Sequence, residues 1–176
     1  HQRQATMELA AVLDKQGRPE EAQKLLEALI LAHPDFRRAP VALAQMLSQK
    51  GKTNQALEIL DRALDRRPQD AILWAERGLL LKNTGRMAAA LAVFEKCIIL
   101  VPGQAKYRVE AALCLIGLGR LQEAAACLKT AVKTDPDNLQ AYVQLAYCLH
   151  RTGNAGRARE IIALVGATFE KDTEYY

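Results

Sequence analysis

Apolar residues recur at helical spacing in the segment 71–104. Trp74, Gly78 and Leu81 stand at i, i+4 and i+7, the spacing of one face of an α-helix, and predict a helix over residues 71–83. The glycine that follows at position 85 can adopt the left-handed conformation that often ends a helix. The pattern therefore predicts a helix with one apolar face and a sharp end.

A second helix is predicted over residues 88–100. One of its faces carries Ala90, Leu91, Phe94, Cys97 and Ile98. Pro102 forbids its continuation, because proline lacks the backbone N–H and its ring clashes with the preceding turn. The segment is thus predicted to form a helix pair followed by a stop.

The same residue types return every 34 positions along the chain. They are Gly17, Gly51, Gly85, Gly119 and Gly153; Ala22, Ala56, Ala90, Ala124 and Ala158; Leu13, Leu47, Leu81, Leu115 and Leu149; and Pro34, Pro68, Pro102 and Pro136. Because several independent positions agree in phase, the chain is predicted to form one domain, 1–176. It would contain five helix pairs, in residues 3–36, 37–70, 71–104, 105–138 and 139–170, and a polar tail, 171–176.

The pattern Trp74, Gly78, Leu81, Ala90, Phe94 and Pro102 resembles the tetratricopeptide repeat family, whose repeat is a 34-residue helix–turn–helix. The resemblance covers nearly the whole chain. It implies an all-α fold, a right-handed superhelical array of antiparallel helix pairs. It also implies a protein–protein interaction scaffold that binds a peptide or an amphipathic helix in its concave groove, with no catalysis in this segment.

Small residues and one variable position accompany the repeat. Ala10, Ala44, Gly78, Ala112 and Ala146 are expected to let two helices approach closely, as are the alanines of the second helices. The position that holds an aromatic residue in the family, called the aromatic slot below, is occupied in the five repeats by Thr6, Pro40, Trp74, Arg108 and Tyr142. Pro40 is expected to lie within the first turn of its helix, where proline is tolerated.

The pattern weakens at the C-terminal end. Gly166 is expected to interrupt the last helix, and residues 171–176 are polar. The family usually carries an additional solvating helix after its last repeat, for which these residues leave no room. Ile161, Ile162 and Val165 would then form an exposed apolar face, a candidate for self-association.

In the family, the first helices line the concave face, and the residues outside the core carry specificity. Val109, Leu113 and Ile116 form a second apolar stripe here. The resemblance places the partner-binding residues at Ile72, Glu76, Leu79, Asn83, Lys106, Val109, Glu110, Leu113, Ile116, Val143, Gln144, Tyr147, His150 and Arg151. Tyr147 is the strongest single candidate, because tyrosine is amphipathic and loses little entropy on binding. The alternative, that neighbouring helices cover these side chains, stays open.

The clamp with which some family members hold acidic chaperone tails is absent. Its leading lysine and asparagine positions are Met7, Ala11, Val41, Gln45, Ala75 and Leu79 here. Glu8, Glu76 and Glu110 would in addition repel a carboxylate. The groove therefore favours a partner with an apolar segment.

No nucleophile motif, phosphate loop or metal-ligand set appears in the sequence, so neither catalysis nor a cofactor is predicted. The charge of +4 is spread through every repeat, which does not imply a nucleic-acid partner, and no segment is apolar for the length of a membrane span. An RNA-binding array of the pentatricopeptide kind is disfavoured by the period of 34. A recruiting or regulatory domain of a larger enzyme or secretion component remains the alternative.

Cys97, Cys114, Cys127 and Cys148 are predicted to be free thiols. Equivalent helices of adjacent repeats lie about 8–10 Å apart, beyond the reach of a disulfide between Cys114 and Cys148. Free thiols and the lack of an apolar leader favour a cytoplasmic protein. The chain begins with His1 rather than Met, so a periplasmic or membrane-tethered fragment of a longer protein stays open.

Overall fold

The computed structural model describes the backbone of residues 2–173 and the side chains of residues 2–166. These residues form helices and no strand. The helices are α1 (Gln2–Lys15), α2 (Pro19–Ala32), α3 (Arg38–Gln49), α4 (Thr53–Arg66), α5 (Ala71–Asn83), α6 (Met87–Leu100), α7 (Ala105–Gly117), α8 (Leu121–Thr134), α9 (Leu139–Arg151) and α10 (Ala155–Thr173). The all-α fold predicted from the repeat is confirmed.

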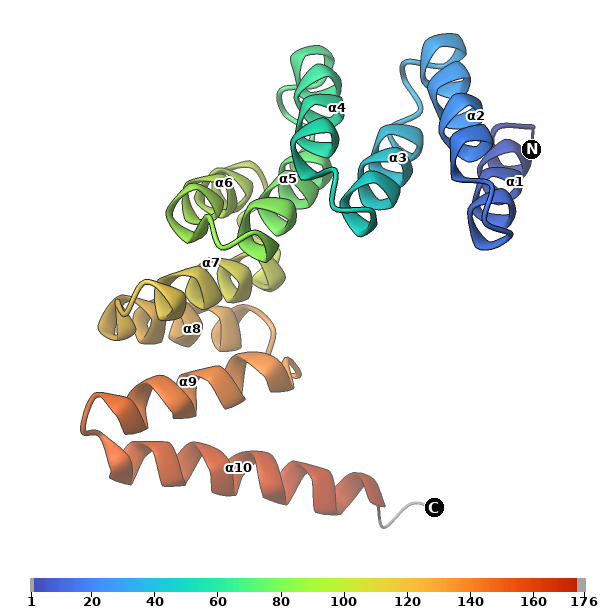
Figure 1. The fold of residues 1–176 in the computed structure, drawn as a ribbon. Coiled ribbons are helices and arrows are strands. Elements are labelled where there is room, and N and C mark those ends of the chain that lie inside the picture. Colours follow the sequence, from blue (N-terminus) through green and yellow to red (C-terminus); the bar gives the residue numbers. More distant parts are fainter. Residues whose placement is uncertain (1, 174–176) are drawn as a thin grey trace. The chain divides into compact units, whose positions relative to one another are not determined.

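The chain divides into two compact units, residues 1–80 and 81–176. In the first unit, α1 packs on α2, α2 on α3 and α3 on α4. In the second unit, each helix from α6 to α9 packs on its successor, and α7 also contacts α9. Consecutive helices within each unit are antiparallel and joined by short turns (Figure 1). Each unit is therefore a row of antiparallel helices, and the boundary between the units falls within α5.

The helix boundaries follow from the local sequence. α5 spans Ala71–Asn83, as predicted, and α6 begins at Met87, one residue before the predicted start. Pro40 lies in the first turn of α3, where its missing N–H has no helical acceptor to lose. The spacing of apolar residues and the turn residues are thus sufficient to place these helices.

The five repeated glycines end the first helix of each pair in the left-handed conformation. Their φ angles lie between 74° and 82°, a region that costs residues with a Cβ atom strain energy. The N–H of the next residue donates to the carbonyl of the repeated leucine, as from Arg86 to Leu81 at 2.9 Å and from Arg120 to Leu115 at 2.9 Å. This is the 6→1 bond of a Schellman motif, which explains why glycine recurs in phase, whereas the leucine recurs because its side chain is buried in the core from the second repeat onward.

The repeated small residues lie where helices meet. Ala22, Ala56, Ala90 and Ala124 have no exposed surface. Leu43, Leu47, Leu60 and Leu73 fill the core of the first unit, and Phe94, Cys97, Cys114, Leu128 and Cys148 fill that of the second. The core is therefore a narrow strip of alternating small and large side chains along each row of helices, as expected for a repeat protein.

The last helix differs from the prediction. α10 continues through Gly166 to Thr173, so Gly166 does not interrupt it, and the first residues of the predicted polar tail are helical. A Cβ at Gly166 would meet nothing within 4 Å, which fits an exposed position in a helix. A lone glycine costs a helix only about 1 kcal/mol relative to alanine, which a long helix can absorb. Among residues 2–173, no helix combines the length and apolar character needed to cross a bilayer.

Candidate partner-binding surface

The predicted partner-binding residues lie on α5, α7 and α9, which are the first helices of repeats three to five. In the first unit, Ile72 is 37% exposed, and Glu76 and Leu79 are half-buried. Glu76 accepts a hydrogen bond from Gln45 Nε2 of α3 at 3.0 Å. Its carboxylate therefore has a partner within the chain.

A pocket of about 350 Å³ opens beside Ile72, on the first-helix side of this unit. It is lined by Met7, Arg37, Arg38, Val41, Ala42, Gln45 and Ile72. The partner-binding residues predicted from the sequence all lie in repeats three to five, and Ile72 is the one among them that lines this pocket. The missed signal was that Met7 and Val41 stand at the same repeat position and both are apolar.

In the second unit, an ion pair joins the charged residues of adjacent first helices. Lys82 Nζ lies 2.5 Å from Glu110 Oε2, and the two side chains are 21% and 25% exposed. Lys106 is exposed, with its ammonium 5.0 Å from the centroid of the Tyr107 ring, and Asn83 is also exposed. Glu110 therefore presents much less free charge than the sequence suggests.

Val109 requires a correction. The spacing places it on the second apolar stripe with Leu113 and Ile116, but the structure leaves its side chain only 2% exposed. α7 packs against α6, α8 and α9, and this contact with three helices covers the first turns of α7. Val109 thus belongs to the core and offers no surface to a partner.

The remaining apolar residues form an exposed surface on α7 and α9, called the α7–α9 patch below. It consists of Leu113 and Ile116, which are half-buried, and Val143 and Tyr147, which are 51% and 41% exposed. Leu113 and Tyr147 hold the same position in successive repeats, and α7 contacts α9 directly. The structure therefore places four of the predicted apolar residues on two helices that are in contact.

Arg151 lies against the tyrosine of this patch. Arg151 NH1 donates to the Tyr147 hydroxyl at 2.8 Å, and its guanidinium carbon lies 5.6 Å from the ring centroid. These contacts hold the ring while leaving much of it accessible. Gln144 is half-buried and His150 is exposed beside them. The patch thus combines an apolar floor with a fixed aromatic side chain and a cationic edge.

The thiols show no sign of reactivity. Cys97, Cys114 and Cys148 are buried, and none of the four cysteines is in a disulfide. Burial raises the pKa of Cys97 and of Cys114 to about 11, since the thiolate would lose its hydration. Within the described residues, no group of three His, Cys, Asp or Glu side chains could hold a metal ion.

Solved structures with this fold include three informative neighbours. MamA from Desulfovibrio magneticus RS-1, residue 41 to the end, is 20% identical with a TM-score of 0.79, covering 96% of each chain. A MamA RS-1 double mutant is 20% identical with a TM-score of 0.80, covering 99% of this chain and 97% of its own. YrrB is 18% identical with a TM-score of 0.68, covering 90% of this chain and 81% of its own.

The similarity to these structures, at such low identity, concerns the fold. No curated protein sequence matches the chain. Family models described as tetratricopeptide repeat match residues 15–80 and 115–176, and a further one matches residues 71–100. Together they account for most of the sequence. The chain therefore belongs to the tetratricopeptide repeat family.

Proposed function

We propose that this chain is a protein-interaction scaffold and that its α7–α9 patch binds an apolar peptide segment or an amphipathic helix. The observation that carries the proposal is the exposure of Val143 and Tyr147 beside Leu113 on adjacent first helices. An exposed aromatic side chain held by a neighbouring contact is typical of an interface anchor. Membership of the family and the description of YrrB as a TPR protein with an unusual peptide-binding site support the same class of function.

The partner is expected to insert apolar side chains spaced for one helix face. Leu113 and Ile116 on α7 and Val143 and Tyr147 on α9 offer two parallel rows that suit anchors at i, i+3 and i+4. Because Lys82 already neutralises Glu110, the patch does not repel an acidic residue at its edge as the sequence implies. Arg151 provides a site where such a residue would be favourable.

The test is partner capture from a lysate of the source organism with the chain and with variants Leu113→Glu and Tyr147→Ala. Ile99→Glu is a matched control, because Ile99 is 77% exposed on α6 and lies outside the patch. Circular dichroism and thermal melts first establish that all four proteins are equally folded. Loss of the same partner in both patch variants, with retention by the control, is the expected result. Retention by all variants would place binding elsewhere.

We further propose that the face of α10 formed by Ile161, Ile162 and Val165 mediates self-association. Ile162 is 61% exposed, and Ile161 and Val165 are half-buried beside it. Light scattering over a range of protein concentrations tests this interpretation. The apparent mass should rise with concentration, and Ile162→Asp should keep the apparent mass at that of one chain. A mass equal to one chain at every concentration would contradict it.

A further inference from the structure

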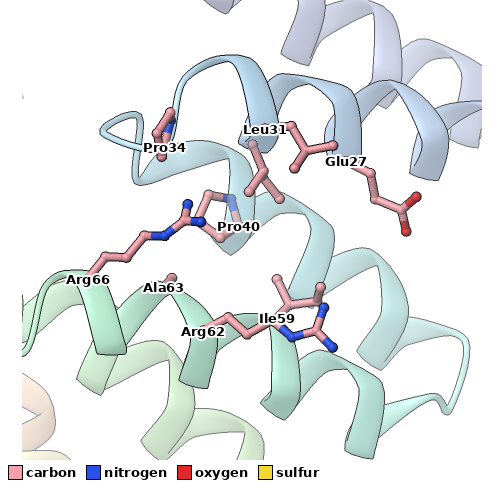
Figure 2. A pocket seen from close by; sticks show the side chains of 9 residues that line it. Glu27, Leu31, Pro34, Pro40, Ile59, Arg62, Ala63 and Arg66 are labelled. Carbon is pink, nitrogen blue, oxygen red and sulfur yellow. The ribbon is translucent and has the colours of Figure 1, made fainter.

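A second hollow lies between the second helices of the first two repeats. It has a volume of about 350 Å³, and its apolar lining comes from Ile30, Leu31, Pro34, Pro40, Ile59 and Ala63. Figure 2 shows Leu31 on α2 and Ile59 and Ala63 on α4 at opposite sides of this space. Leu31 is 79% exposed at its edge. We call this feature the α2–α4 hollow; it lies within the first unit.

The residue in the aromatic slot explains why this space is empty. Pro40 occupies the slot of the second repeat, and Trp74 occupies that of the third. The indole Nε1 of Trp74 donates to the carbonyl of Pro68 at 2.9 Å. Pro34 and Pro40 stand one period before Pro68 and Trp74, and both line the hollow. The hollow therefore lies where an aromatic side chain would stand if this repeat carried one.

The charged residues around the hollow differ in sign between its two helices. Arg62 and Arg66 project from α4, whereas Glu27 belongs to α2. Arg66 and Glu27 lie at opposite ends of the hollow, with Arg66 on the side of Pro34 (Figure 2). Arg62 lies 4.0 Å from Glu58, but Arg66 has no ion pair or hydrogen bond within the part of the chain that the structure describes. A carboxylate at the Arg66 end would therefore meet complementary charge.

We propose that the α2–α4 hollow binds a partner protein segment that carries an aromatic side chain next to a carboxylate. The aromatic ring enters between Leu31, Pro40 and Ile59, in the place that the missing slot residue leaves open. The carboxylate pairs with Arg66. This surface belongs to the first unit and shares no residue with the α7–α9 patch, so it would take a partner segment of its own.

The probe is an acetylated and amidated pentapeptide, Ser-Glu-Trp-Asp-Ser, added to the full ¹⁵N-labelled chain. Two matched peptides replace the tryptophan by alanine or both acids by their amides. Saturable changes in backbone amide shifts are expected for residues of α2 and α4 with the first peptide. The alanine peptide should produce none, and the amide peptide should bind about threefold to fivefold more weakly, as for the loss of a surface ion pair.

Variants of the chain test whether the peptide binds in the α2–α4 hollow. Pro40→Trp fills the hollow with the side chain found in the next repeat and should abolish the shifts. Leu31→Glu, at an exposed position that should not affect folding, should weaken binding more than tenfold. Arg66→Glu should weaken it about threefold to fivefold, whereas the same charge change at exposed Arg159 on α10 should have no effect.

Four results would each overturn the proposal. They are the absence of saturable shifts with the first peptide, shifts confined to residues outside α2 and α4, equal binding of the alanine peptide, and unchanged binding to folded Pro40→Trp or Leu31→Glu. Concentration-dependent shifts of the α2 and α4 amides without any peptide would also overturn it, since a second copy of the chain would then be the occupant.

Discussion

Lys82 and Glu110 connect α5 to α7 through a direct ion pair, with Lys82 Nζ 2.5 Å from Glu110 Oε2. Both side chains are mostly buried, so water screens this pair less than one at an open surface. A double-mutant cycle with Lys82→Ala and Glu110→Ala should give a coupling energy of about 0.5–1 kcal/mol in the free energy of unfolding. The coupling should shrink at 1 M salt. A coupling of zero at low salt would contradict the geometry.

The glycine turns should respond to substitution differently from the glycine in the last helix. Gly85 has φ of 76°, so Gly85→Ala should lower the free energy of unfolding by about 1 kcal/mol through backbone strain. Gly166→Ala lies in the interior of α10, where a Cβ meets nothing within 4 Å, and should raise helix stability by about 0.5–1 kcal/mol. Chemical denaturation and amide exchange of the two variants measure both effects. Equal changes in stability for Gly85→Ala and Gly166→Ala would contradict this prediction.

The alanine at position 124 should tolerate no larger side chain. Ala124 is fully buried at the start of α8, whereas Ala126, two residues later, is exposed. Ala124→Leu should destabilise the fold by about 1–3 kcal/mol through overpacking, and Ala126→Leu should change stability by less than about 0.5 kcal/mol. Thermal and urea denaturation measure both. An unchanged midpoint for Ala124→Leu would count against close helix contact there.

Replacing Arg108 in the aromatic slot should increase the stability of the fold. Its Nε is buried and has no hydrogen-bond partner, which carries a desolvation cost. Arg108→Tyr introduces the residue type found at Tyr142 and should raise the free energy of unfolding by about 1 kcal/mol. Arg108→Met separates the effect of removing the buried N–H from the effect of adding an aromatic ring, because methionine keeps an apolar stem and has no N–H. Destabilisation by both variants in urea denaturation would show that the guanidinium contributes net stability.

Buried thiols should weaken the fold at high pH. Burial raises the pKa of Cys97 and Cys114 from 9.0 to about 11, so between these values the folded state holds more protons than the unfolded state. The free energy of unfolding therefore falls as pH rises through this range, by up to about 1.4 kcal/mol per pH unit and thiol. The double variant Cys97→Ala with Cys114→Ala should flatten the slope in urea denaturation between pH 8.5 and about 11. An unchanged slope would mean that neither thiol is protonated preferentially in the folded state.

Local patterns predicted the helices well because their causes are local. Apolar spacing and turn residues placed α5 from Ala71 to Asn83, and the repeated glycines all adopt the left-handed conformation that the turns require. Gly166 misled the prediction because tolerance of a glycine depends on the length of the surrounding helix, here Ala155–Thr173. The low helix propensity of glycine at one position does not show how long the surrounding helix is.

The candidate surface was less predictable, since exposure depends on contacts between helices. Val109 fits the apolar stripe of Leu113 by spacing, yet it is buried where α7 meets its neighbours. The free charge of Glu110 depends in the same way on Lys82, a residue 28 positions away. The hollow at Pro40 could not be predicted, because its existence depends on the space between two helices. The sequence shows only that proline stands where the family has an aromatic residue.

The aromatic slot also has a consequence for how the chain finds its fold. Five hairpins built on one plan can exchange with one another, or with those of another molecule, while they assemble. The slot holds a different residue each time: Thr6, Pro40, Trp74, Arg108 and Tyr142. A hairpin docked out of order would set a side chain of one size and charge against neighbours that pack around another. The slot residue thus distinguishes each hairpin from the others, and so helps to determine the order in which the hairpins stack.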